Sequence, residues 1–125
     1  MIWNYIYIAI FGVLGCCARF AMTGLIQLLW GNGFPDATLF INLSGAFIMG
    51  FLFVETLERL TLNPAVRTGI LTGFLGGYTT FSTYALEAAT LATTGQPLVA
   101  LLYIALSNVL GVLAAFAGAY IARNL

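Results

Sequence analysis

The sequence predicts an all-α integral membrane protein with four transmembrane helices, the third of which is broken. Of its 125 residues, 62% are hydrophobic and 6% are charged, whereas soluble domains carry about 25% charged residues. A spanning helix needs roughly 20 apolar residues, so the chain has room for four spans in a single transmembrane domain, residues 1–125. Glycine and hydroxyl residues interrupt the third apolar segment in its middle. This interruption predicts the break.

The first span is expected from about residue 3 to residue 30. Trp3 and Trp30 lie at its ends, as interfacial aromatic belts require. Arg19 is the only charged residue between them. Its side chain either snorkels to the interface or has a function, lining a vestibule or pairing with a carboxylate, because charge within a membrane is a functional hypothesis by default. Both interpretations of Arg19 stay open.

The second span is expected from about residue 37 to residue 54 and ends at a charged run that begins with Glu55. Asn42 lies in its apolar interior. A buried amide offers two N–H donors and must find partners. Asn42 therefore either holds helices together or presents its N–H groups to a permeating species.

The third span is expected from about residue 65 to residue 94, with the break near residues 74–79 and a helix resuming near Thr80. The segment from Gly73 to Tyr84 contains three glycines, and each glycine inside a helix costs about 1 kcal/mol relative to alanine. In lipid, a broken backbone is tolerated only where it is buried in protein or lines a watery cavity. The alternative is a kinked packing helix, in which Gly73 and Gly77 form a GxxxG motif.

The fourth span is expected from about residue 98 to residue 121. It is predicted to be a packing helix with one polar stripe near its start, formed by Tyr103, Ser107 and Asn108. Small residues recur along it at a spacing that lets helix backbones approach closely; these are Gly111, Ala115, Gly118 and Ala122.

The composition excludes several classes of function. The chain has no histidine and no lysine, so it lacks Ser-His and Cys-His pairs, His-based metal sites and a Walker lysine; it is not expected to be an enzyme. It has no basic patch, which argues against nucleic acid as a partner. The remaining polar side chains are mostly neutral, and neutral donors let an anion enter without trapping it. An unwound backbone also frees carbonyl oxygens, which coordinate hard cations.

The run Gly76-Gly77-Tyr78-Thr79-Thr80-Phe81-Ser82-Thr83, followed by Glu87, resembles the signature of the Fluc (CrcB-type) fluoride channels. The pieces Asn42-x-x-Gly45 and Asn108-x-x-Gly111, together with Arg19, agree with it, so the resemblance extends over all four spans. One position departs from the family pattern. Tyr84 stands where the family usually has a second phenylalanine, so the ring edge is kept and a hydroxyl is added.

The resemblance implies an antiparallel homodimer inserted in both orientations in the bacterial cell membrane, with two fluoride pathways along the dimer interface and one central structural Na⁺. By position, the backbone carbonyls of Gly76 and Thr79 would hold Na⁺. The fluoride pathway would be formed by Asn42, Phe81, Tyr84, Ser82, Thr83, Tyr103 and Ser107. The vestibule or structural polar positions would be Arg19, Glu87 and Asn108.

Two other functions are weighed against a fluoride channel. A small multidrug transporter also has four spans, but it needs an embedded acid in the first span, where this chain has only Arg19. A non-conducting structural subunit would use its glycines only to pack helices.

Overall fold

The structure, a computed structural model, describes all 125 residues and is entirely helical. Its three long helices are α1 (Ile2–Trp30), α2 (Asp36–Glu58) and α6 (Pro97–Arg123). Each is long and apolar enough to cross a membrane. The predicted all-α class is confirmed. The count of four spans stays a prediction, because the segment between α2 and α6 consists of shorter helices.

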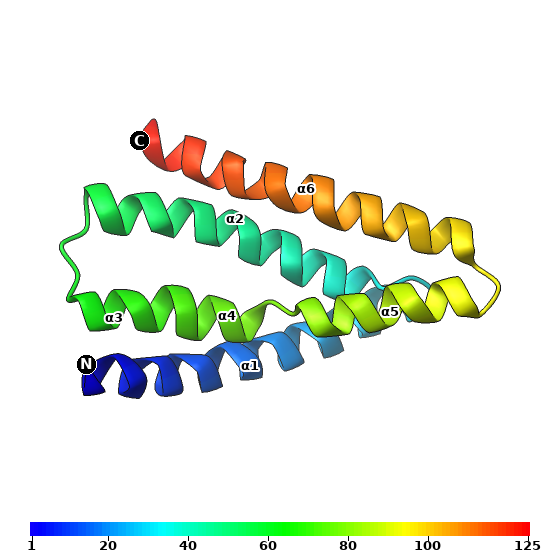
Figure 1. Ribbon diagram of the computed structural model, residues 1–125, viewed down its shortest axis with the longest axis horizontal. Coiled ribbons are helices and arrows are strands. Elements are labelled where there is room, and N and C mark those ends of the chain that lie inside the picture. The colour runs from blue at the N-terminus through cyan, green and yellow to red at the C-terminus, as the bar shows by residue number, and fades with distance from the viewer.

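These shorter helices are α3 (Pro64–Thr68), a π-helical segment (Gly69–Phe74), α4 (Leu75–Tyr78) and α5 (Phe81–Thr93). In Figure 1 they follow one another along the length of the molecule, with an irregular connection between α4 and α5. Both chain termini and the α2–α3 connection lie at the same end (Figure 1). The predicted break in a helix is therefore confirmed.

The break occupies only the end of the predicted segment. Gly76, Gly77 and Tyr78 remain helical, and only Thr79 and Thr80 adopt extended backbone before the helix resumes at Phe81. Gly73 and Gly77 serve packing, because a Cβ added at either would lie less than 3.0 Å from a carbonyl oxygen of α1. Close packing of this GxxxG pair therefore accompanies the break.

A second close approach joins α2 to α6, which lie side by side in Figure 1. A Cβ at Gly50 would overlap the backbone carbonyl of Ala115, and one at Gly118 would overlap that of Phe47. Gly118 and Ala115 belong to the predicted small-residue stripe, which is confirmed there. Gly111 of the same stripe faces open space.

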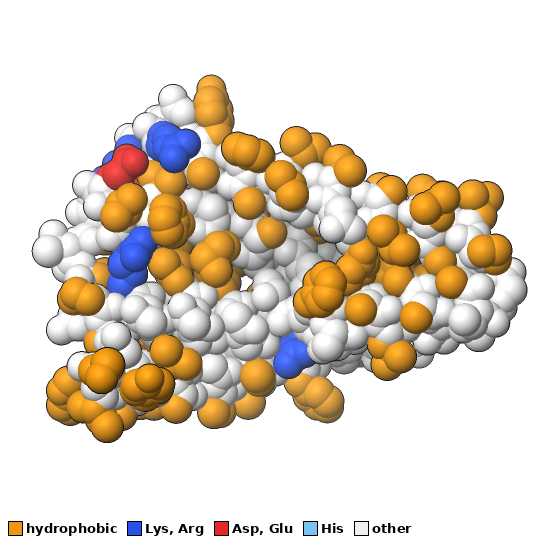
Figure 2. Space-filling view, viewed as in Figure 1, with side chains coloured by type: hydrophobic (Ala, Val, Ile, Leu, Met, Phe, Trp, Pro, Cys, Tyr) orange, Lys and Arg blue, Asp and Glu red, His pale blue; other side chains and the backbone are white.

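Figure 2 shows the outer surface covered largely by hydrophobic side chains. Charged side chains gather at the end that holds the termini, with one further basic side chain nearer the middle (Figure 2). The only ion pair joins Arg59 to Glu55, at 2.7 Å, one turn apart at the end of α2. An apolar surface with charge at its ends is typical of a protein that crosses a bilayer.

Candidate functional site

The break between α4 and α5 is held by one side chain from another helix. Asn42 in α2 accepts a hydrogen bond from the Thr80 amide, 2.8 Å from its Oδ1, and donates from Nδ2 to the Thr80 carbonyl at 2.9 Å. The Asn42 side chain thereby gives the Thr80 amide an acceptor in place of its helical one and adds a donor to the Thr80 carbonyl. Thr80 then begins α5, because its Oγ1 accepts a hydrogen bond from the Thr83 amide at 3.3 Å, as N-cap threonines do.

The break leaves several backbone carbonyls without their helical donors, among them those of Gly76 and Thr79. In a continuous helix the Gly76 carbonyl would accept from the Thr80 amide, and the Thr79 carbonyl from the Thr83 amide. Both amides bond elsewhere, to Asn42 and to the Thr80 hydroxyl. The two carbonyls are those that the sequence comparison with the Fluc pattern singled out. Gly76 is exposed, with open space beside its Cα.

The two interpretations of Asn42 are both compatible with this geometry. One N–H and the carbonyl oxygen hold the break together, as helix-joining amides do. A primary amide has two N–H groups, and the second N–H of Asn42 has no partner within the chain. That second donor lies directly beside the freed backbone.

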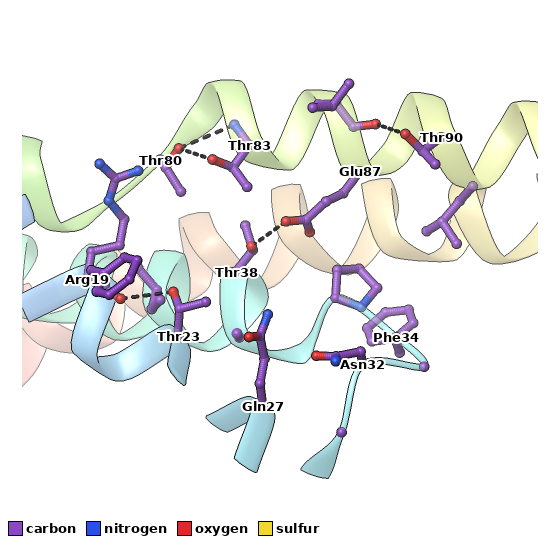
Figure 3. A pocket seen from close by; sticks show the side chains of 18 of the residues that line it. Arg19, Thr23, Gln27, Asn32, Phe34, Thr38, Thr80, Thr83, Glu87 and Thr90 are labelled. Carbon is purple, nitrogen blue, oxygen red and sulfur yellow. Dashed lines mark hydrogen bonds between the residues drawn. The ribbon is translucent and has the colours of Figure 1, made fainter. Parts of the chain in front are cut away.

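A pocket of about 740 Å³ opens on one side of the break, between α1, the α1–α2 connection, α2 and α5. Figure 3 shows it from close by, with Arg19 and Thr80 at one end and Thr90 and Phe34 toward the other. Its polar lining consists mainly of neutral side chains: Thr23, Gln27, Asn32, Thr38, Thr80, Thr83 and Thr90, joined by Arg19 and Glu87.

Arg19 is half-buried at this pocket and forms no ion pair. Its guanidinium lies 3.8 Å from the Cys16 sulfur. Arg19 therefore lines the pocket without a carboxylate partner in the chain, and its vestibule role stays a prediction.

Glu87 is bound by two hydroxyl groups from two other helices. The Thr38 hydroxyl donates to one carboxylate oxygen at 2.6 Å, and the Tyr103 hydroxyl donates to the other at 3.0 Å. Tyr103 is fully buried. Sequence reasoning missed Thr38, although a signal existed: it precedes Asn42 by four residues, so both side chains lie on one face of α2.

Phe81 and Tyr84 lie outside the pocket lining. Phe81 is 77% exposed, whereas Tyr84 is 9% exposed. Their ring centroids are 5.5 Å apart, because residues three positions apart are neighbours on a helix. The Tyr84 ring faces α6, where it lies 5.3 Å from that of Tyr103. The Asn108 amide donates to the Tyr84 hydroxyl at 2.9 Å.

Two serines of the predicted site have no hydrogen-bond partner. Ser82 is exposed, and no group of the chain bonds its hydroxyl. The Ser107 Oγ is buried without a partner. The structure therefore divides the predicted residues into three groups: the freed backbone with Asn42, the pocket with Arg19, Thr83 and Glu87, and the contact of α5 with α6, which holds Tyr84, Tyr103 and Asn108. Phe81 and Ser82 are exposed at the start of α5.

The sequence also matches a known protein family and several named proteins. Residues 6–119 match the family described as "CrcB-like protein, Camphor Resistance (CrcB)". A protein of Acidithiobacillus ferrooxidans named "Fluoride-specific ion channel FluC" is 54% identical over 118 residues, covering 94% of both chains. Proteins of the same name from Aquifex aeolicus and Syntrophotalea carbinolica are 41% and 40% identical, over 94% and 98% of this chain and 95% and 99% of their own.

These relatives are bacterial and are named ion channels, not enzymes. Together with the three long apolar helices, they identify a multi-pass membrane protein. The family match, residues 6–119, spans the break and the positions of Asn42 and Glu87 in this chain. The chain belongs to the CrcB-like family.

Proposed function

We propose that this protein is a fluoride-selective passive channel that exports F⁻ across the bacterial cell membrane. The observation that carries the proposal is the 54% identity, over 94% of both chains, to a protein named as a fluoride-specific ion channel. The neutral polar inventory supports it. Fast conduction requires donors that replace water without holding the ion too tightly, and Asn42 has one N–H to spare beside the break.

The route would combine the Asn42 amide at the break with groups of α5 and α6. Asn42 donates an N–H, and Phe81 offers the positive edge of its ring. Ser82, Thr83, Tyr84, Tyr103 and Ser107 complete the polar lining. Glu87 does not repel the anion with a bare carboxylate, because Thr38 and Tyr103 each bond one of its oxygens.

The single chain leaves polar groups exposed halfway along the broken segment. The Gly76 carbonyl has lost its helical partner and Ser82 is exposed beside the break, while Asn108 is exposed on α6. In lipid, each unsatisfied backbone group costs several kcal/mol. A second copy of the chain would cover this face, and an antiparallel pair inserted in both orientations would create two equivalent pathways along the interface.

The freed carbonyls of Gly76 and Thr79 fit a hard monovalent cation, because neutral backbone oxygens are ligands that such ions accept. Na⁺ at the centre of the dimer would be held by these two carbonyls from each copy. When bound, it would supply the positive charge that two facing sets of carbonyl dipoles lack. Its role is structural, linking the copies at the break.

The test is fluoride efflux from liposomes that contain the purified protein, measured with a fluoride electrode without a proton gradient. Rapid release of fluoride with retention of chloride is the expected result. A folded dimer that released no fluoride would overturn the assignment. Complementation of cells that lack their own fluoride exporter distinguishes the channel from both a multidrug transporter and a structural subunit, because neither would restore growth in fluoride.

A further inference from the structure

The hydrogen bonds of Asn108 fix the direction in which the Tyr84 hydroxyl can donate. The Asn108 Nδ2 lies 2.8 Å from the Ile104 carbonyl and 2.9 Å from the Tyr84 hydroxyl. A carbonyl oxygen is only an acceptor, so this position must be the nitrogen and not the amide oxygen. The same nitrogen then donates to Tyr84, whose oxygen is the acceptor.

The proton of the Tyr84 hydroxyl is therefore free. No group of the chain accepts it, although Tyr84 is 9% exposed. A buried donor without an acceptor is costly, and such a donor points to a ligand that is itself an acceptor. Ser107, one residue before Asn108, has a buried hydroxyl that also lacks a partner. The ring that carries the free Tyr84 hydroxyl lies 5.5 Å from the ring of Phe81, which is exposed.

We propose that the Tyr84 hydroxyl, aimed by Asn108, is a hydrogen-bond donor to the permeating anion and raises the affinity of the pathway for fluoride. The inference rests on the proposed function. Tyr84 is here a specificity-determining residue, and Asn108 is a positioning residue that acts through it. Fluoride gains most among the halides because it is the smallest and the strongest hydrogen-bond acceptor of them.

Tyr84→Phe tests the donor, because it removes the hydroxyl and keeps the ring. The readout is the fluoride concentration that gives half-maximal flux through reconstituted dimers. We expect this concentration to rise by about tenfold, since a hydrogen bond to a charged group contributes about that factor or more. Tyr120→Phe is the matched control, because Tyr120 is 69% exposed on the same helix as Asn108; it should leave the concentration unchanged.

Asn108→Asp tests the positioning without touching Tyr84. A carboxylate at this position accepts a hydrogen bond from the Tyr84 hydroxyl. The hydroxyl then no longer donates to the anion, so the half-maximal concentration should again rise. In the Tyr84→Phe background the same change should add much less, because its target is gone. A merely structural role for Asn108 would lower the fraction of active dimers and leave the half-maximal concentration as it is.

The outcomes separate the two proposals. If the wild-type protein conducts fluoride and Tyr84→Phe has the same or a lower half-maximal concentration, the hydroxyl is not a fluoride donor and the channel assignment stands. If the wild-type dimer conducts no fluoride, the channel assignment itself fails.

Discussion

Asn42 shows how one side chain can shape the backbone and still leave a donor for a ligand. Its Oδ1 and one N–H bond the amide and carbonyl of Thr80, and the break exists because these two groups are satisfied from outside the helix. Replacing Asn42 therefore changes the backbone and the pathway together, and the choice of substitution decides which effect dominates.

Asn42→Asp keeps an oxygen to accept from the Thr80 amide but removes both N–H donors. We expect fluoride efflux to slow by at least about tenfold, because a hydrogen bond to the anion is lost and a negative charge is added beside it. Liposome efflux measures the effect, and gel filtration checks that the dimer persists. Asn124→Asp adds the same charge at the exposed C-terminus and should be neutral. Wild-type rates for Asn42→Asp would remove this residue from the pathway.

A substitution at Phe81 should affect conduction without affecting stability. Its side chain is 77% exposed, so Phe81→Ile removes little packing within the chain. The aromatic edge is lost, however, and with it a weak anion donor. Efflux is expected to fall by about tenfold or more, corresponding to roughly 1.4 kcal/mol, with the thermal midpoint nearly unchanged. Phe116→Ile, at a comparably exposed position of α6, serves as the control; equal losses at both positions would contradict a specific role.

Among the helices, the α2–α6 crossing depends on the absence of side chains. A Cβ at Gly118 would overlap the Phe47 carbonyl, whereas a Cβ at Gly111 meets nothing within 4 Å. Gly118→Ala should destabilise the protein by about 1–3 kcal/mol, as overpacking does. Gly111→Ala in the same helix should cost little. Thermal or denaturant unfolding in detergent measures both, and equal midpoints would show that the helices separate at no cost.

At the scale of helices, the sequence alone predicted much of the fold. Apolar length predicted the long helices, and the interrupted segment predicted a break. The break was expected near residues 74–79 and lies at Thr79 and Thr80. Its exact residues could not be predicted, because they depend on Asn42, which is 38 residues before Thr80 in the sequence. Glycine was the strongest local signal, and Gly77 instead packs against α1. The Thr38–Glu87 contact could not be predicted either, because its two residues are 49 positions apart in the sequence.

At the scale of the whole molecule, the orientation of the chains in the membrane can be tested. An antiparallel dimer with two-fold symmetry contains one copy in each orientation across the membrane. About half of the chains should therefore have their C-terminus outside the cell, and the other half inside. The variant Asn124→Cys, in which Cys16 and Cys17 are also replaced by serine, can be labelled with a membrane-impermeant maleimide in intact cells and in permeabilised cells. Labelling of about half of the chains in intact cells is expected. Labelling of all or of none would show a single orientation.

Removal of Na⁺ should loosen the whole assembly. If the Gly76 and Thr79 carbonyls hold the ion only in the folded dimer, Na⁺ stabilises the dimer by mass action. Replacing Na⁺ with N-methylglucamine in detergent should lower the thermal midpoint, and titrating Na⁺ back should restore it saturably. A midpoint that did not depend on Na⁺ would exclude a structural ion at these carbonyls.

The π-helical segment Gly69–Phe74 has a consequence for how this gene can change. Its widened turn, in which the Leu75 amide bonds the Ile70 carbonyl five residues before it, accommodates one more residue than an α-helical turn. Removing one residue here would restore an ordinary α-helical turn and keep the helices before and after it facing nearly the same way, so Gly69 and Gly77 would still fit against α1. Within a regular helix such as α2, the same deletion would rotate everything that follows by about 100°. Deletions of one codon should therefore be tolerated better in the π-helical segment than inside α2.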